Sequence, residues 1–362
     1  MELEVQKLLR EHGLDWVKEE LKLEVKIKDN LVLLKYNQIA ADWRKTALYD
    51  CRGIILDMTD NWNVVCYPYR KFFNLEEGYC APINWDNAIV FEKADGSLMT
   101  LWYYKGEWRC STSGTIDADS TCNGGEFTFA DLLWQAVKEM YGSKEAFLAK
   151  LNPHFNYMFE LCTPYNIVVT QHTESKILLH GVRDMRTWEE DFIDGYDLFK
   201  VKTHDINNEA DMRATFGNLT WQDEGYIVMD KTNMNRGKCK NPDYVSVHHQ
   251  KSSVSPYEIV NIVKINEIDE FCVYFKERTE LILLLKANWD ILEARLNTIW
   301  VDTLKSGNFD SQRDFALTVQ TIDREYHAMM YKMKSGKIKT IREGMCELDN
   351  RFLYNYLQDE RA

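Results

Sequence analysis

The chain has 362 residues, of which 45% are hydrophobic and 28% charged, a composition typical of globular proteins. This length predicts about two domains, with enough buried surface to fold without disulfides or structural metals. The formal net charge of −13 argues against a protein that coats nucleic acid by charge alone. No apolar run is long enough to cross a bilayer, and nine scattered cysteines without a CxxC pair favour reduced thiols in the cytoplasm.

The first 250 residues mostly alternate between apolar and polar side chains, which is the period of half-buried strands. Turn dipeptides such as Asp29-Asn30 and Asp60-Asn61 separate these runs and predict hairpins. Strands are expected over residues 23–27, 31–36, 53–57, 63–67, 88–92, 98–104 and 225–229. With helices expected over residues 2–20 and 128–140, this part of the chain is predicted to be an α+β domain of antiparallel sheets.

After residue 251 the hydrophobic period changes to 3.6 and remains so to the end of the chain. Ser255-Pro256-Tyr257-Glu258 has the pattern of a helix start, with Ser as N-cap, Pro in the first turn and Glu closing a capping box. Helices are expected over residues 257–275, 279–304, 311–332 and 337–357. We therefore predict one domain over residues 1–251 and an all-helical C-terminal domain over residues 252–362.

The most specific motif is Lys93-Ala94-Asp95-Gly96-Ser97, which lies between two expected strands. One interpretation is an Asp-Gly hairpin turn that follows a surface lysine. Its companions along the chain favour a site instead. They are Arg52-Gly53, Lys71-Phe72-Phe73, Phe159-Glu160, Asp223-Glu224-Gly225 and Lys238-Cys239-Lys240, with Tyr244 four residues further on.

This ordered set resembles the covalent nucleotidyltransferases, the superfamily of ATP-dependent ligases and mRNA capping enzymes. Within it, the chain resembles the first family of bacteriophage RNA ligases, the tRNA-repair type. The motif resemblance covers roughly residues 36–250. It implies a nucleotidyltransferase fold over residues 1–251, which would carry out adenylylation, and a C-terminal domain that selects RNA or tRNA. It also implies the host cytoplasm as the compartment if the gene is carried by a phage.

The resemblance implies a reaction that uses ATP and Mg²⁺ and passes through a lysyl-AMP and an RNA-adenylate. Lys93 would be the nucleophile, Glu224 would position the metal, and Lys238 and Lys240 would act on the α-phosphate. Glu160 would bind a ribose hydroxyl, and Tyr244 belongs to the Lys-x-Lys-x-x-x-Tyr run that supports the assignment. The nucleotide site would be completed by Tyr36, Arg52, Lys71 and Phe73. RNA, with tRNA broken in its anticodon loop as the implied substrate, is the expected partner; neither a membrane nor an obligate protein partner is expected.

Lysine chemistry explains why cations belong in this set. An ordinary lysine has a pKa of about 10.4 and is almost fully protonated at pH 7, so it is a poor nucleophile. Neighbouring cations such as Lys238 and Lys240 disfavour the charged form of Lys93, and they also stabilise charge that develops on the phosphate.

Two positions depart from the ligase pattern. After the second strand of the lysine motif the family usually places a basic residue, but residues 111–115 read Ser-Thr-Ser-Gly-Thr. Arg109, the hydroxyl groups of this stretch, or no residue would then contact the triphosphate. The arginine expected after Asn166 is also missing.

The helical domain carries two further candidates. Asp269-Glu270 resembles an acidic pair to which this family's C-terminal domain has a metal linked, although a solvated helix face explains it as well. Basic side chains gather at Lys332, Lys334, Lys337, Lys339 and Arg342, which makes this the best candidate for an RNA phosphate track. His172, His248 and His249 are interpreted as structural or phosphate-side residues, because they lack the spacing of metal ligands.

Two other functions remain open. A DNA ligase or a capping guanylyltransferase would share the first step, but such enzymes normally append a β-barrel domain, against which the helical period after residue 255 argues. A protein of this fold that only binds RNA or a partner would be favoured by a broken lysine set, whereas Lys93, Glu224, Lys238 and Lys240 are all present.

Overall fold

The computed structural model of the chain describes residues 2–38, 40–122, 125–166, 169–245, 257, 259–274, 278–305 and 311–358. The chain divides into two compact units, Met1–His249 and Gln250–Ala362. In the described part of the chain, no helix has the length and apolar character that a membrane crossing needs. All nine cysteines are free thiols.

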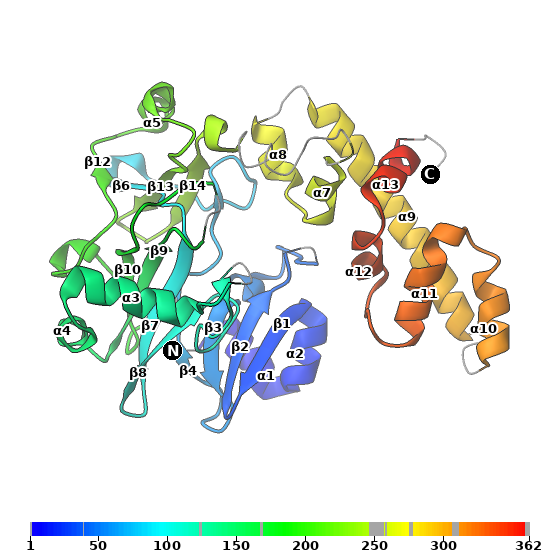
Figure 1. Cartoon of the computed structure of the whole chain (residues 1–362), viewed down its shortest axis with the longest axis horizontal. Helices are drawn as coiled ribbons and strands as arrows, with labels where there is room; N and C mark the ends of the chain where they lie inside the picture. The colour runs from blue at the N-terminus through cyan, green and yellow to red at the C-terminus, as the bar shows by residue number, and fades with distance from the viewer. Residues whose placement is uncertain are drawn as a thin grey trace. The chain divides into compact units, whose positions relative to one another are not determined.

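The first unit contains three sheets (Figure 1). The first has the order β1-β2-β3-β4, with strands Leu23–Lys28, Leu31–Tyr36, Arg52–Asp57 and Asn63–Cys66. The second has the order β11-β10-β9-β7-β8, with β7 Ser97–Tyr104, β8 Glu107–Thr112, β9 Phe155–Cys162, β10 Lys176–Asp184 and β11 Glu190–Asp191. The third has the order β12-β6-β13-β14-β5, with β5 Phe73–Asn74, β6 Ala88–Glu92, β12 Thr203–His204, β13 Gly225–Asp230 and β14 Arg236–Lys240.

These sheets confirm the predicted α+β class and the expected hairpins. Every described strand pair is antiparallel except β14 with β5. β1 and β2 join through Asp29, whose φ is +53°, and the turn pairs Lys28 with Leu31 as the dipeptide predicted.

The helices of the first unit are α1 (Glu4–His12), α2 (Leu14–Leu21), α3 (Phe129–Tyr141), α4 (Lys144–Leu148) and α5 (Glu209–Ala214). Thr128 caps α3, as its predicted start requires, by accepting a hydrogen bond from the backbone of Asp131. The single helix expected over residues 2–20 is wrong. Gly13 has a φ of +80° and separates two helices there, since this conformation ends a helix.

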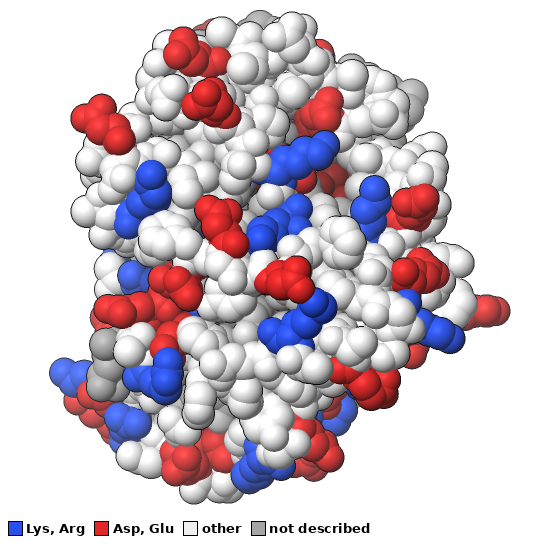
Figure 2. Space-filling model, turned by 90° about the vertical axis from the view of Figure 1, so that its left-hand side faces the viewer, with Lys and Arg blue, Asp and Glu red and all other residues white. Residues whose placement is uncertain are grey.

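The largest core of the first unit lies between α3 and the second sheet and includes Leu133, Val137, Phe159 and Leu179. A separate core packs α1 and α2 against the first sheet through Val5, Leu9 and Val17. Figure 2 shows basic and acidic side chains interspersed over one face of the unit. The acidic net charge is therefore not gathered into a patch of one sign on that face.

The described elements of the second unit are helices that share one core. They are α7 (Ile259–Lys264), α8 (Ile268–Tyr274), α9 (Thr279–Lys305), α10 (Gln312–Val319), α11 (His327–Lys334), α12 (Ile341–Cys346) and α13 (Asn350–Leu357). Only α9 runs the full length that the period predicts. Each of the other three expected helices is split in two. Asn266, at φ +57°, separates α7 from α8. A new helix begins at His327 after α10, and Asp349 caps a new helix after α12. The predicted capping box at Ser255 and Glu258 lies outside the described residues.

Candidate active site

Lys93 lies on a connection between two sheets. It follows β6, which pairs with β12 and β13, whereas β7 pairs with β8 and β9. The hairpin interpretation of Asp95-Gly96 is therefore wrong. The backbone N–H of Lys93 donates to the carbonyl of Gly225 at 2.8 Å, which continues the pairing of β6 with β13 up to the lysine.

The turn after Lys93 is held in place from two directions. The Asp95 carboxylate accepts hydrogen bonds from the backbone N–H groups of Val169 and Thr170, at 3.0 and 2.7 Å. Gly96 lies directly against β9, where a Cβ atom would come within 2.5 Å of the Leu161 carbonyl oxygen. Only glycine permits this approach, so distant parts of the chain determine where Lys93 lies.

The nearest charged partner of Lys93 is Glu224, whose Oε1 atom lies 2.5 Å from Nζ. The side chains are 22% and 8% exposed. Burial raises the pKa of Glu224 above its usual value, while the positive charges of Lys93 and Lys240 offset part of that rise. The pair is thus an ammonium group held by a carboxylate with an unusually high proton affinity.

Lys238 and Lys240 lie on one face of β14, because successive strand residues point to opposite faces. Lys240 pairs with Gly225, the residue after Glu224, and Lys238 pairs with Ile227. Gly225 has a φ of +132°, and a Cβ atom there would lie 2.2 Å from the Cys239 carbonyl oxygen. This close approach places Lys240 beside the Lys93–Glu224 pair, where its charge acts on Glu224.

Glu160 and Tyr244 meet the same turn. A Cβ atom on Gly96 would lie 3.1 Å from Cγ of Glu160, and Nε2 of His180 lies 3.4 Å from a Glu160 carboxylate oxygen. Tyr244 is 2% exposed, and burial together with the charges of Glu224 and Asp95 raises its pKa. The structure thus brings together Lys93, Glu160, Glu224, Lys240 and Tyr244.

Tyr36, Lys71 and Phe73 form a second group with Trp43, at the ends of β2 and β5. The Lys71 ammonium lies 5.4, 5.1 and 4.9 Å from the ring centres of Tyr36, Trp43 and Phe73. Three aromatic faces around one cation form a cation–π cage. The Arg52 guanidinium lies 5.0 Å from the ring centre of Phe72, and its buried Nη1 atom has no hydrogen-bond partner among the described residues.

Arg109 is engaged elsewhere in the fold. It pairs with Asp117 at 2.5 Å and lies over the Trp102 ring. In residues 111–115, the Thr112 hydroxyl accepts hydrogen bonds from Gly114 and Thr115 and closes a local turn. A Cβ atom on Gly53 would lie 2.8 Å from Cα of Ser113, so this turn packs beside Arg52. Of the alternatives for the missing basic residue, the geometry favours the hydroxyl groups or no contact.

The remaining candidates are the acidic pair, His248 and His249, and the basic cluster of the helical unit. Asp269 lies on α8, and the side chain of Glu270 is outside the described part of the structure, as are His248 and His249. Among the described residues no group of three or more His, Cys, Asp or Glu side chains is arranged to hold a metal ion. In the basic cluster Lys332 pairs with Glu347 at 2.5 Å and Arg342 with Glu293 at 3.9 Å, so acids offset part of its charge.

Several site residues have weak sequence signals. Asp95 and Gly96 belong to the lysine motif but had no role predicted for them, and Trp43 stands in no motif. Asn166, which donates to the Ser97 hydroxyl at 2.6 Å, and His172, whose ring lies 2.6 Å from the Asp95 carbonyl, are distant from Lys93 in sequence.

Lys93, the carboxylate beside it and the two lysines on the neighbouring strand are the residues that the resemblance assigned to a covalent nucleotidyltransferase site. A profile of the RNA ligase family matches residues 50–246, which is more than half of the chain. The chain belongs to the RNA ligase family. The predicted phage-type RNA ligase class is thereby confirmed.

Two relatives are similar to this chain over most of its length. A protein of Autographa californica nuclear polyhedrosis virus, named provisionally as a bifunctional polynucleotide kinase/RNA ligase, is 26% identical over 88% of this chain and 48% of its own length. The RNA ligase of Rhodothermus phage RM378 is 25% identical over 76% of this chain and 77% of its own. This chain therefore spans about half the length of the first relative. An archaeal ATP-dependent RNA ligase structure aligns with a TM-score of 0.47 and 14% identity, over 78% of this chain and 79% of that one.

Proposed function

We propose that this chain is an ATP-dependent RNA ligase that joins 5′-phosphate and 3′-hydroxyl ends through lysyl-AMP and RNA-adenylate intermediates. The observation that carries the proposal is the 2.5 Å pair between Lys93 and Glu224, with Lys240 beside it. A lysine exposed at a simple turn would not be expected to pair with a buried carboxylate that lies 131 residues away in the chain.

In the first step the Lys93 ammonium passes a proton to Glu224, whose raised pKa suits it as an acceptor. The amine then attacks the α-phosphorus of ATP, an N–P bond forms, and the P–O bond to pyrophosphate breaks. Lys238 and Lys240 stabilise the charge on the α-phosphate oxygens. Mg²⁺ would enter with the ATP substrate, because it takes most of its ligands from phosphates and water, and Glu224 would help to position it, as the resemblance implies.

In the second step an RNA 5′-phosphate oxygen attacks the phosphorus of lysyl-AMP, which releases the Lys93 amine and forms RNA-adenylate. In the third step an RNA 3′-hydroxyl attacks the 5′-phosphorus, loses its proton, and AMP leaves. We assign the nucleoside to the aromatic side chains of Tyr36, Trp43 and Phe73. Arg52 and Lys71 would contact ribose or phosphates, Glu160 a ribose hydroxyl, and Tyr244 would position the Asp95 turn.

The finer assignments rest on the family resemblance. We propose broken tRNA as the substrate, the helical residues 252–362 as the part that selects it, residues 1–251 as the adenylylation domain, and the cytoplasm as the compartment. The acidic pair Asp269-Glu270 remains a candidate metal site.

Incubation with α-³²P-labelled ATP or GTP, followed by denaturing electrophoresis, tests the proposal. We expect a covalent label from ATP alone, its loss in Lys93→Ala, and its retention in Lys26→Ala, a matched change at an exposed lysine of β1. Label from GTP would identify a capping enzyme, and no label would favour a binding module. Sealing of RNA ends in preference to DNA ends separates the proposed activity from that of a DNA ligase.

A further inference from the structure

A cavity of about 630 Å³ lies in the first unit between the segment before β5, the turn between β10 and β11, and the β13–β14 hairpin. Five cations line it, Arg70, Lys71, Arg183, Lys231 and Arg236, against the two carboxylates of Glu189 and Glu190. Its charge is thus opposite in sign to that of the chain as a whole.

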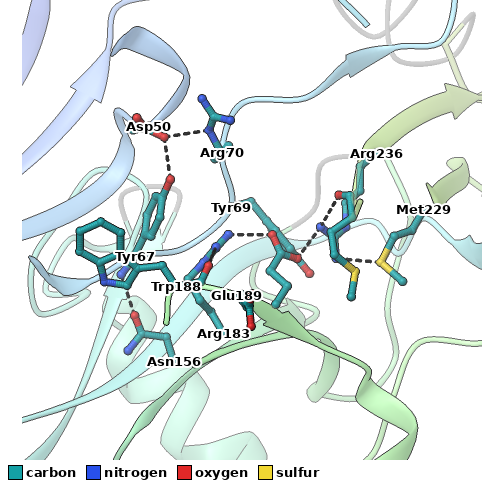
Figure 3. Close-up of polar contacts among 12 residues, drawn as sticks. Asp50, Tyr67, Tyr69, Arg70, Asn156, Arg183, Trp188, Glu189, Met229 and Arg236 are labelled. Carbon is teal, nitrogen blue, oxygen red and sulfur yellow. Dashed lines mark hydrogen bonds and ion pairs between the residues drawn. The ribbon is translucent and has the colours of Figure 1, made fainter. Parts of the chain in front are cut away.

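The floor of the cavity holds a buried excess of positive charge. The Glu190 carboxylate pairs with both Arg183 and Arg236, and all three side chains are at most 9% exposed. Figure 3 shows the two arginines reaching this point from different strands. The Nε atom of Arg183 is buried without a hydrogen-bond partner among the described residues. Two guanidinium groups on one carboxylate leave one cation uncompensated, and a buried charge of this kind favours binding of an anion.

The rim combines cations with aromatic side chains. Lys231 is exposed at the tip of the β13–β14 hairpin, and Arg70 is 53% exposed while paired with Asp50. Tyr79 is 43% exposed, and its ring centre lies 5.6 Å from that of Phe73. A single-stranded nucleic-acid site usually combines cations that bind phosphates with aromatic faces on which bases stack.

One residue that lines the cavity, Arg236, shares a face of β14 with the proposed catalytic lysines. Arg236, Lys238 and Lys240 alternate with Gly237 and Cys239, so their side chains share one face. Cys239 packs on the other side in a core with Tyr226 and Val228. About 13 Å of strand separates Arg236 from Lys240, a span that a short length of nucleic acid covers.

We infer that this cavity binds a nucleotide of the single-stranded RNA next to the ends being joined, with a phosphate against Arg183, Arg236 and Lys231. The base would stack on Tyr79. The inference rests on the proposed function and adds a binding site for the RNA strand to it. Lys93, Glu224, Lys238 and Lys240 do not line the cavity, whereas Lys71 and Phe73, which we assign to ATP, do line it, so the RNA nucleotide would lie next to the bound ATP.

The test measures two steps in the full-length chain. Fluorescence anisotropy with a labelled short single-stranded RNA reports RNA binding over a range of salt concentrations, and lysyl-AMP formation from ATP reports the first step. The variants are Lys231→Ala and Tyr79→Leu, both at exposed positions where folding tolerates the change, with Lys26→Ala as the matched control.

We expect Lys231→Ala to lower the slope of log affinity against log salt by about 0.7, the value for one lost phosphate contact with a single strand. Tyr79→Leu should weaken RNA binding about fivefold or more through lost stacking. Both variants should form lysyl-AMP at the rate of the unmodified chain, and Lys26→Ala should change neither measurement.

Unchanged RNA binding in both variants would overturn the inference. A raised ATP requirement for lysyl-AMP formation with unaltered RNA binding would also overturn it and would assign the cavity to ATP. Failure of the unmodified chain to form lysyl-AMP, with RNA binding still sensitive to Lys231, would instead refute the proposed ligase function and leave the RNA site standing.

Discussion

Substitution of Lys93 by alanine should make the protein lose more stability with rising pH than the unmodified chain does. The reason is the partner that the change leaves behind. Glu224 is 8% exposed and loses both the charge and the hydrogen bond of Lys93, while Lys240 remains as a cation near it. Burial already raises the pKa of Glu224, so removing Lys93 raises it further.

The sign and size of the effect follow from proton linkage. Because the folded-state pKa of Glu224 lies above its unfolded value of 4.5, folding favours the protonated carboxyl group. Below the unfolded pKa the carboxyl group is protonated in both states, and as pH rises toward the folded pKa the free energy of unfolding falls by about 1.4 kcal/mol per pH unit. Breaking a fully buried ion pair costs about 3–5 kcal/mol. Since Lys93 is 22% exposed, we expect a smaller loss at neutral pH, about 1–3 kcal/mol.

Urea denaturation between pH 5 and 8 measures this loss in Lys93→Ala, Glu224→Gln and the double variant. The unmodified chain is first treated with pyrophosphate, which removes any AMP bound to Lys93. We expect Lys93→Ala to lose stability progressively above pH 5 and the double variant to lose little, since it has no carboxylate to bury. A loss that is constant with pH, or one that persists in the Glu224→Gln background, would refute the role assigned to the pair.

Two further changes test the neighbouring cations and the helical unit. If Lys240 disfavours the charged form of Lys93, Lys240→Ala should move the pH inflection of single-turnover lysyl-AMP formation upward; an unmoved inflection with a uniformly lower rate would leave Lys240 as a phosphate ligand only. Charge reversal of the exposed Lys337 and Lys339 to glutamate should reduce sealing of broken tRNA more than sealing of short oligonucleotides, because only the longer substrate would reach the second unit. Equal losses on both substrates would mean that this cluster does not select RNA, and Lys26→Glu serves as the control for added negative charge.

Much of the fold could be predicted because its signals are local. Alternation over residues 23–27 and the Asp29-Asn30 turn act between neighbouring residues, so β1 and β2 appear where the sequence places them. Thr128 caps α3 for the same reason, since its partner Asp131 is three residues away. Helix ends were harder to predict. The hydrophobic period continues through Gly13 and Asn266, whereas their positive φ angles end the helices.

The ordered motifs around Lys93, Glu224, Lys238 and Lys240, together with the Lys-Phe-Phe stretch and the helical C-terminal part, were enough to predict the family. Tertiary structure alone decided how these residues meet. The Lys93–Glu224 pair joins strands of one sheet that are distant in sequence, and the Lys71 cage takes Trp43 from a segment that carries no motif. The Arg183–Glu190–Arg236 cluster has no sequence signal, because each arginine lies in a strand whose local pattern shows only burial. Local spacing determines elements and motifs, whereas buried charge pairs depend on which strands become neighbours, and that is decided by the packing of the whole unit.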